Sequence, residues 1–126
     1  MFRTDYLASD GHEIFLSFED KNRNKLYSLL RLRIPSQAKP VFNILKDSAI
    51  IREVHTYGQQ IKVAKKSTAA QHQGLGKKLI SQAEQIAKHE FSLNKMAVIS
   101  GVGVREYYKK LGYTLKDTYM VKKLKK

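Results

Sequence analysis

The sequence contains no cysteine among its 126 residues. Without cysteine the chain can form no disulfide, no thiolate metal site and no cysteine-bound iron–sulfur cluster. No apolar run approaches the roughly 18 residues that a membrane-spanning helix needs. The first residues, Met1 to Asp5, also lack the apolar segment of a secretory signal peptide. These absences together predict a cytoplasmic protein that has no membrane segment.

Acidic residues are scarce as well. Eleven Asp and Glu stand against 24 Lys and Arg, which gives a formal net charge of +13. A charge so far from zero on a small domain favours a polyanionic partner such as RNA, although solubility alone is the alternative explanation. No recognisable RNA-binding motif accompanies the charge. The candidate nucleic-acid contacts are Arg31, Arg33, Lys62, Lys65 and Lys66, and the alternative for each is an ordinary solvated face.

The chain has the length of one domain, residues 1–126, and its 42% hydrophobic content is typical of a folded globule. Periodicity predicts a mixed α/β layer, in which strands precede a helix, a strand, a second helix and further strands. The expected elements are a strand hairpin (Ile14–Phe18 and Leu30–Ile34), a central strand (Ala49–Tyr57), a long amphipathic helix (Gly74–Glu90), an apolar strand (Met96–Ile99), a short helix (Val104–Leu111, ended by Gly112) and a terminal hairpin (113–121).

The most specific motif is the glycine loop Gln71–Gly76, which leads directly into the long helix. A helix N-terminus without bulky side chains exposes backbone N–H donors and positive partial charge, and it therefore suits a pyrophosphate. The spacing is neither that of the dinucleotide fingerprint nor that of the P-loop. It resembles the pyrophosphate loop of the GCN5-related N-acetyltransferases. An ordinary glycine-rich helix start is the alternative for Gly74 and Gly76.

Longer blocks resemble a narrower family over nearly the whole chain. The sequence is similar, block after block, to the C-terminal GCN5-related acetyltransferase domain of the catalytic subunit of Elongator. The blocks are residues 5–8, 15–20, 29–33, 51–58, 71–76, 83–87, 99–113 and 119–122. Smaller departures occur at Tyr27–Ser28, where the family has a glycine, and at Asp117–Thr118, where it has Gly-Pro. The resemblance implies the GCN5-related acetyltransferase fold, a mixed and mostly antiparallel sheet flanked by helices.

The same resemblance implies an acyltransferase that binds acetyl-CoA and hydrolyses it, coupled to tRNA binding, to form the carboxymethyl group of a tRNA wobble uridine. By that resemblance the pantetheine lies along the central strand and the pyrophosphate lies in the loop. The implied cofactor-binding residues are Glu53, Val54, His55, Thr56, Gln71, Gln73, Gly74, Leu75, Gly76, Lys77 and Tyr108.

The family also carries a radical S-adenosylmethionine domain with a cysteine-bound iron–sulfur cluster. Because this chain has no cysteine, that domain, its S-adenosylmethionine and its cluster are expected to lie outside it. The expected partners are tRNA, the radical domain and other Elongator subunits.

Two residues are candidates for the chemistry. The resemblance favours Tyr108 as the acid that protonates the leaving thiolate, with Tyr107 as the competitor and a core aromatic as the alternative. Glu53 shares a strand face with His55 and could act as a base, or it could be a structural carboxylate paired with Arg52 or Arg31. No set of His, Asp and Glu has the spacing of a metal site.

Two other functions remain open from the sequence. One is a stand-alone acetyltransferase that acts on lysine or a small amine. The other is a non-catalytic RNA-binding module that has kept the same fold.

Overall fold

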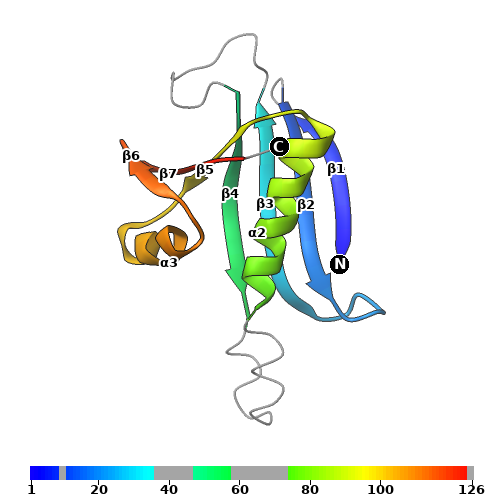
Figure 1. The fold of residues 1–126 in the computed structure, drawn as a ribbon. Coiled ribbons are helices and arrows are strands. Elements are labelled where there is room, and N and C mark those ends of the chain that lie inside the picture. Colours follow the sequence, from blue (N-terminus) through cyan, green and yellow to red (C-terminus); the bar gives the residue numbers. More distant parts are fainter. Residues whose placement is uncertain (9–10, 36–46, 58–73, 125–126) are drawn as a thin grey trace.

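A computed structural model describes residues 1–8, 11–35, 47–57 and 74–124. In this part of the chain seven strands form one sheet in the order β1-β2-β3-β4-β5-β7-β6 (Figure 1). Every neighbouring pair is antiparallel except β4 and β5, which are parallel. The predicted mixed, mostly antiparallel sheet is therefore confirmed. The strands are β1 (Phe2–Ala8), β2 (Gly11–Glu19), β3 (Leu26–Pro35), β4 (Ser48–Thr56), β5 (Lys95–Ile99), β6 (Thr114–Lys116) and β7 (Tyr119–Lys123).

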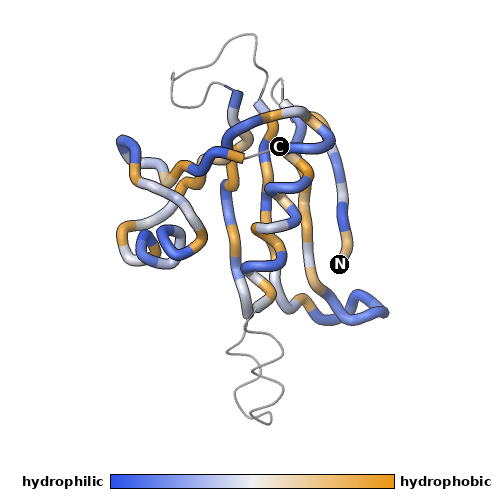
Figure 2. Tube along the Cα trace, in the orientation of Figure 1, coloured by the Kyte–Doolittle hydropathy of each residue, from blue (hydrophilic) through white to orange (hydrophobic). Residues whose placement is uncertain are grey.

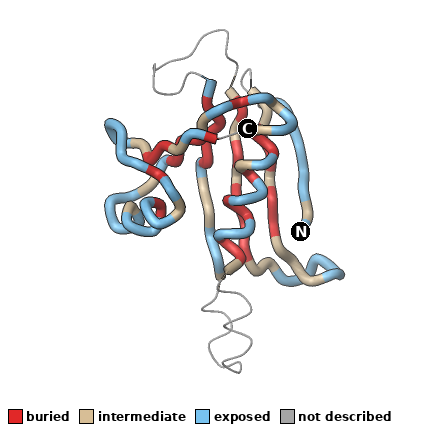
Figure 3. The backbone as a smooth tube through the Cα atoms, viewed as in Figure 1, coloured by how far each residue is buried: buried red, intermediate tan, exposed pale blue. Residues whose placement is uncertain are grey.

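One long helix covers a single face of β2, β3 and β4 (Figure 1). Helix α2 (Leu75–Gln85) continues into a π-helical turn, η3 (Ile86–Glu90), so the predicted helix is confirmed, with its last five residues π-helical. The predicted apolar stripe is buried at all of its positions, namely Leu75, Leu79, Ile80, Ala83, Ile86 and Ala87. Apolar and buried segments coincide between the helix and the sheet, which locates the core there (Figures 2 and 3). No helix in the described ranges is long and apolar enough to cross a bilayer.

Strands β4 and β5 stay together for only a short distance. They pair from Ser48–Lys95 to Ile51–Val98. Beyond that point β4 has a bulge. Arg31 of β3 pairs with Glu53 while its neighbour Leu32 pairs with Ile51, so the backbone of Arg52 has no pairing partner on β3. A bulge bends its strand and strengthens the twist. The second half of β4 therefore diverges from β5.

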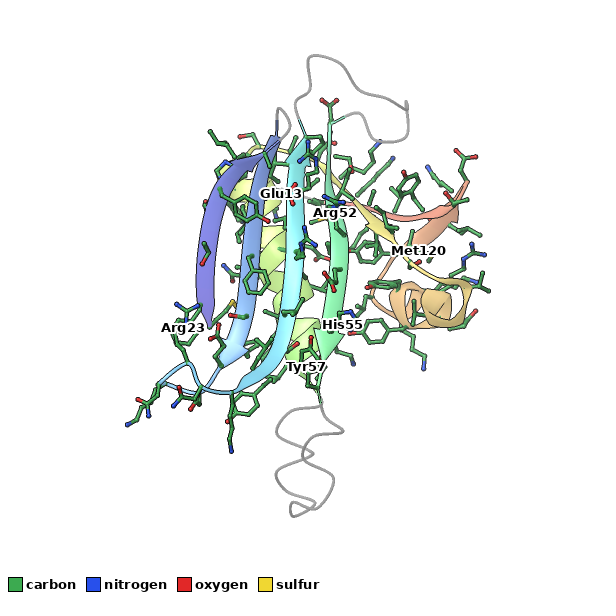
Figure 4. All side chains as sticks on the ribbon, turned by 180° about the vertical axis from the view of Figure 1, so that it is seen from behind. Glu13, Arg23, Arg52, His55, Tyr57 and Met120 are labelled. Atoms are coloured by element: carbon green, nitrogen blue, oxygen red, sulfur yellow. The ribbon has the colours of Figure 1, made fainter. Side chains whose placement is uncertain are left out.

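The bulge also reverses the alternation of side chains along β4. Ala49 and Ile51 lie in the core before the bulge, and Val54 packs against the core after it. Without the extra residue Glu53 would take the inward position, since successive strand residues face opposite sides. The bulge thus directs Glu53 and His55 to the sheet face opposite α2, where Glu53 pairs with Arg31 of β3. Figure 4 is turned toward this face and labels His55. The prediction that these two residues share a face is confirmed.

The C-terminal elements, residues 102–123, form what is called the C-terminal wall of the molecule. The short turn η4 (Val102–Val104) leads into α3 (Arg105–Lys110), and Gly112 follows with a φ of +97°, a left-handed conformation that favours glycine. Strands β6 and β7 then form the predicted hairpin.

Tyr113 connects this wall to α2. Its side chain is fully buried, and its hydroxyl donates a 2.7 Å hydrogen bond to Oε2 of Glu84. Burial and the Glu84 carboxylate raise the pKa of Tyr113 above its ordinary value. Lys122 Nζ lies 3.2 Å from Oε1 of the same carboxylate. The carboxylate of Glu84 therefore joins α2, β7 and the end of α3.

We expect Tyr113→Phe to lower the free energy of unfolding by roughly 1–3 kcal/mol, because a part-buried carboxylate loses one hydrogen bond. Chemical denaturation followed by circular dichroism measures this value. Tyr119→Phe, at a half-buried tyrosine on β7, is the matched control and should stay within about 0.5 kcal/mol of wild type. Equal stability of both variants would show that the bond contributes nothing.

Candidate functional site

A cleft of about 520 Å³ opens where β4 and β5 diverge. One wall is the edge of β4 from Arg52 to Thr56, and the other is the end of β5 with the turn at Ser100 and Gly101. Residues of η4 and α3 complete the second wall, and Gly76 of α2 also lines the cleft. The site is thus built by the divergence of two parallel strands beside a helix N-terminus.

The structure brings together six of the predicted cofactor-binding residues. Glu53, Val54, His55, Thr56, Gly76 and Tyr108 all line the cleft. Gly74, Leu75 and Lys77 lie in the first turn of α2 next to it, where Leu75 is buried and Lys77 is exposed. Gln71 and Gln73 lie outside the described residues, as do Lys62, Lys65 and Lys66.

The first turn of α2 exposes backbone donors. Gly74 is the N-cap residue and supplies no side-chain hydrogen bond, and the first turn contains no acidic residue. The first helical N–H bond runs from Lys78 to the Gly74 carbonyl over 3.1 Å. The N–H groups of residues 75–77 therefore precede the hydrogen-bonded ladder, at the positive end of the helix dipole. Such a terminus attracts an anion.

Gly76 lies close to side chains of both cleft walls. A Cβ atom at this position would lie 3.3 Å from the Tyr107 hydroxyl and 3.4 Å from Oγ1 of Thr56. Helix α2, strand β4 and helix α3 therefore meet at Gly76. A larger residue would push on the Tyr107 and Thr56 side chains.

Two adjacent tyrosines of α3 differ in their burial. Tyr108 is only 6% exposed, and burial, with a smaller contribution from Tyr107, raises its pKa to about 12. Tyr107 is 37% exposed, and burial raises its pKa as well. Their rings meet edge to face at 5.2 Å, and Tyr108 packs in the same way on Tyr113 at 5.6 Å. Tyr108 thus belongs to the core cluster and also lines the cleft, and its role in the chemistry stays a prediction.

The charged groups of the β4 wall form a short chain on the face opposite α2. Oε1 of Glu53 lies 3.1 Å from Nε2 of His55, and Oε2 of Glu53 lies 3.5 Å from Nη1 of Arg31. Of the two arginines considered as partners of Glu53, Arg31 forms the ion pair. Arg52 instead lies 3.8 Å from Oε1 of Glu13.

Arg33 and Arg31, two of the predicted nucleic-acid contacts, are both engaged with carboxylates. Arg33 donates hydrogen bonds to Glu13 at 2.7 Å and to the Ala8 carbonyl at 3.1 Å, and its side chain is 19% exposed. Arg31 is the more accessible of the two, with 39% of its side chain exposed. A role in RNA binding stays a prediction for both.

Sequence reasoning did not assign Arg52, Ile99, Ser100, Gly101 and Val104 to the site, although all of them line the cleft. The spacing of Val104, Tyr107, Tyr108 and Leu111 predicted a helix with one apolar face. The helix exists, but Val104 and Tyr107 are exposed to the cleft. The sequence signal for these residues was the glycine-containing turn at Ser100 and Gly101, directly after the apolar strand, because a ligand can approach the backbone closely at such a turn.

Within the described ranges, no group of three or more His, Asp or Glu side chains could hold a metal ion.

Three comparisons place these features among known proteins. Residues 48–113 match the model of the acetyltransferase (GNAT) family. The chain is 49% identical to a tRNA uridine(34) acetyltransferase of Dehalococcoides mccartyi, over 97% of this chain and 27% of that protein. It is 48% identical to Elongator complex protein 3 of Mus musculus, over 99% of this chain and 23% of that protein.

Among solved structures, the archaeal Elp3 of Methanocaldococcus infernus superimposes with a TM-score of 0.84 at 42% identity, over 98% of this chain and 29% of that chain. This chain therefore spans about a quarter of the length of the relatives it matches.

We expect Gly76→Ala to displace the Tyr107 ring, because the new methyl group meets its hydroxyl. The free energy of unfolding should change by less than about 1 kcal/mol, because the higher helix propensity of alanine offsets the cost of moving the Tyr107 ring. Chemical shifts of the Tyr107 ring measure the displacement. Gly103→Ala has open space around its Cβ and is the control. Unchanged Tyr107 shifts in Gly76→Ala would contradict the contact.

Proposed function

Because this chain belongs to the acetyltransferase (GNAT) family, we propose that its cleft binds acetyl-CoA and hydrolyses it in support of tRNA wobble-uridine modification. The observation that carries the proposal is the divergence of β4 from β5 beside the uncapped N-terminus of α2. The cleft is lined by Gly76, in a helix start that suits a pyrophosphate, and by Tyr108. Coenzyme A combines a long polar arm, the pantetheine, with a diphosphate, so it matches both features.

The pantetheine arm is expected along the edge of β4. Residues 52–56 lie beyond the last pair that β4 forms with β5. A strand edge of this kind offers N–H and C=O groups to an extended ligand, which then binds as an added strand. Val54 and Thr56 would contact the arm, and the N–H groups of Leu75, Gly76 and Lys77 would hold the diphosphate. Gln71 and Gln73 are further predicted phosphate contacts.

Tyr108 would stabilise the departing thiolate. With a pKa of about 12 its phenol stays protonated at neutral pH. Complete transfer of that proton to a thiolate of ordinary pKa near 8.5 is uphill by about 5 kcal/mol. A hydrogen bond from the hydroxyl to the developing sulfur charge needs no such transfer. We therefore assign Tyr108 as a hydrogen-bond donor to the leaving group.

Transfer-RNA is the proposed macromolecular partner. The net charge of +13 suits a polyanion, and one relative is named a tRNA uridine(34) acetyltransferase. Since the chain spans about a quarter of its relatives, completion of the uridine modification would need partners outside it. A radical S-adenosylmethionine domain and other Elongator subunits are the partners we propose, with S-adenosylmethionine and the iron–sulfur cluster held in that domain.

Tyr108→Phe should lower the rate of acetyl-CoA hydrolysis, measured with and without tRNA, by roughly 10²-fold or more, the usual cost of removing one donor to developing charge. The affinity for acetyl-CoA should fall much less. Tyr119→Phe on β7 is the control and should hydrolyse acetyl-CoA at the wild-type rate.

Other outcomes of this assay would decide between functions. A stable acetylated amine among the products would favour a lysine or small-amine acetyltransferase. Binding of tRNA without any binding of acetyl-CoA would favour a non-catalytic RNA module. An unchanged hydrolysis rate in Tyr108→Phe would refute the role of that residue.

Binding of tRNA should weaken steeply as salt rises, because phosphate neutralisation releases counterions. Arg31→Gln should reduce the slope of log K against log[salt] by about 1 if Arg31 contacts a phosphate. Titration of labelled tRNA at several salt concentrations measures the slope. Arg23→Gln, in the turn between β2 and β3, is the control. A wild-type affinity that does not depend on salt would contradict the electrostatic argument.

A further inference from the structure

We infer that His55 is the general base that activates water against the acetyl thioester, and that Glu53 and Arg31 are positioning residues that orient it. This inference rests on the proposed function and adds a residue to its chemistry. Among the residues that line the cleft, His55 and Glu53 are the two that could accept a proton at neutral pH.

The geometry separates the roles of these two residues. Both oxygens of the Glu53 carboxylate face cations or a potential cation, since Oε1 lies 3.1 Å from His55 Nε2 and Oε2 lies 3.5 Å from Arg31 Nη1. Both oxygens of the Glu53 carboxylate are therefore already engaged with protein groups and are less available to a water molecule. On the imidazole, by contrast, Nδ1 has no hydrogen-bond partner among the described residues. Nδ1 is therefore the atom available to a water molecule.

The position of His55 is fixed by contacts on both sides. Its ring stacks on Tyr57 with centroids 6.0 Å apart and 24° between the planes. Its carbonyl accepts a 2.8 Å hydrogen bond from Ser28 Oγ of β3, which anchors the strand at this point. More than half of the side chain, 56%, is exposed, so water reaches the imidazole. In Figure 4 His55 and Tyr57 lie at the end of β4.

The charged and titratable groups around His55 come from three elements. Glu53 on β4 and Tyr57, the residue after β4, neighbour it, and Arg31 on β3 reaches it through Glu53. Tyr107 and Tyr108 on α3 line the other wall of the same cleft. Of these groups, the Glu53 carboxylate is the one that contacts a ring nitrogen of His55.

The reaction balances without a further reactant. Nδ1 of His55 takes a proton from water while the water oxygen bonds to the acetyl carbon. The carbon–sulfur bond then breaks, and acetic acid and the coenzyme A thiolate leave, with the Tyr108 hydroxyl hydrogen-bonded to the sulfur. The imidazolium returns its proton to the thiolate or to solvent, and the acetic acid releases its own proton to solvent. Glu53 contacts Nε2 of the imidazole and orients the ring.

The test compares His55→Ala with His89→Ala, whose histidine is exposed on η3 away from the cleft, in tRNA-stimulated acetyl-CoA hydrolysis by the full chain. We expect kcat to fall at least about 10²-fold in His55→Ala, as is typical for loss of a general base, with acetyl-CoA affinity kept within about threefold. Added imidazole should restore part of the rate. His89→Ala should match wild type.

The pH profile separates the base from its positioning residue. In the wild type the rate should fall on the acidic side as the base becomes protonated, and His55→Ala should lose this acidic limb. Glu53→Gln should keep the limb, because the imidazole that acts as the base is still present. This variant should lower kcat by about tenfold.

Each failure has its own signature. If the wild type neither binds nor hydrolyses acetyl-CoA with tRNA present, the proposed function fails, and this inference fails with it. If the wild type hydrolyses acetyl-CoA and His55→Ala keeps its rate and its acidic limb, the inference alone is overturned. If Glu53→Gln abolishes the limb while His55→Ala retains it, Glu53 is the base and the assignment of roles is wrong.

Discussion

The structure depends on one backbone irregularity, the bulge at Arg52 in the middle of β4. An unbroken β4 would keep pairing with β5 and leave no space between the strands. It would also turn Glu53 into the core, where a carboxylate is costly without a partner. One extra residue therefore opens the cleft and places the ionisable side chains on its outer rim. Fold and candidate chemistry follow from the same local event.

A cleft made by two diverging strands needs a second constraint to keep its walls in place. On one side α2 packs against β2, β3 and β4 through its buried stripe. On the other, the C-terminal wall is attached by β5 and β7 and by the bonds of Glu84 with Tyr113 and Lys122. Tyr108 packs directly on Tyr113, so the position of the proposed thiolate donor depends on the Glu84 carboxylate. Residues outside the cleft thus determine its width.

The sequence predicted those elements that bury a regular apolar pattern. The hairpin of β2 and β3 and the stripe of α2 followed from periods of two and 3.6 residues, and the structure confirms them. Strand β1 was missed because it is an exposed edge strand, where Arg3 and Asp5 replace the apolar alternation. The bulge at Arg52 could not be predicted, since it depends on pairing with β3. For the same reason the spacing did not show that Val104 and Tyr107 line a cleft, because a helical face has the same pattern whether a core or a ligand covers it.

The two walls of the cleft offer opposite environments, and the proposed thioester hydrolysis would use both. The departing sulfur must be met by a group that keeps its proton, and burial provides this at Tyr108, which is 6% exposed with a pKa of about 12. Water must be met by a group that accepts a proton, and such a group must remain solvated. His55 meets this requirement because the bulge directs it away from the core, with Glu53 beside it. If the two environments were exchanged, burial would oppose protonation of the imidazole, and water would compete for the hydrogen bond of an exposed phenol. The asymmetry of burial across the cleft therefore argues for the order of proton movements, from water to the β4 wall and then, by way of solvent, to the sulfur at the α3 wall.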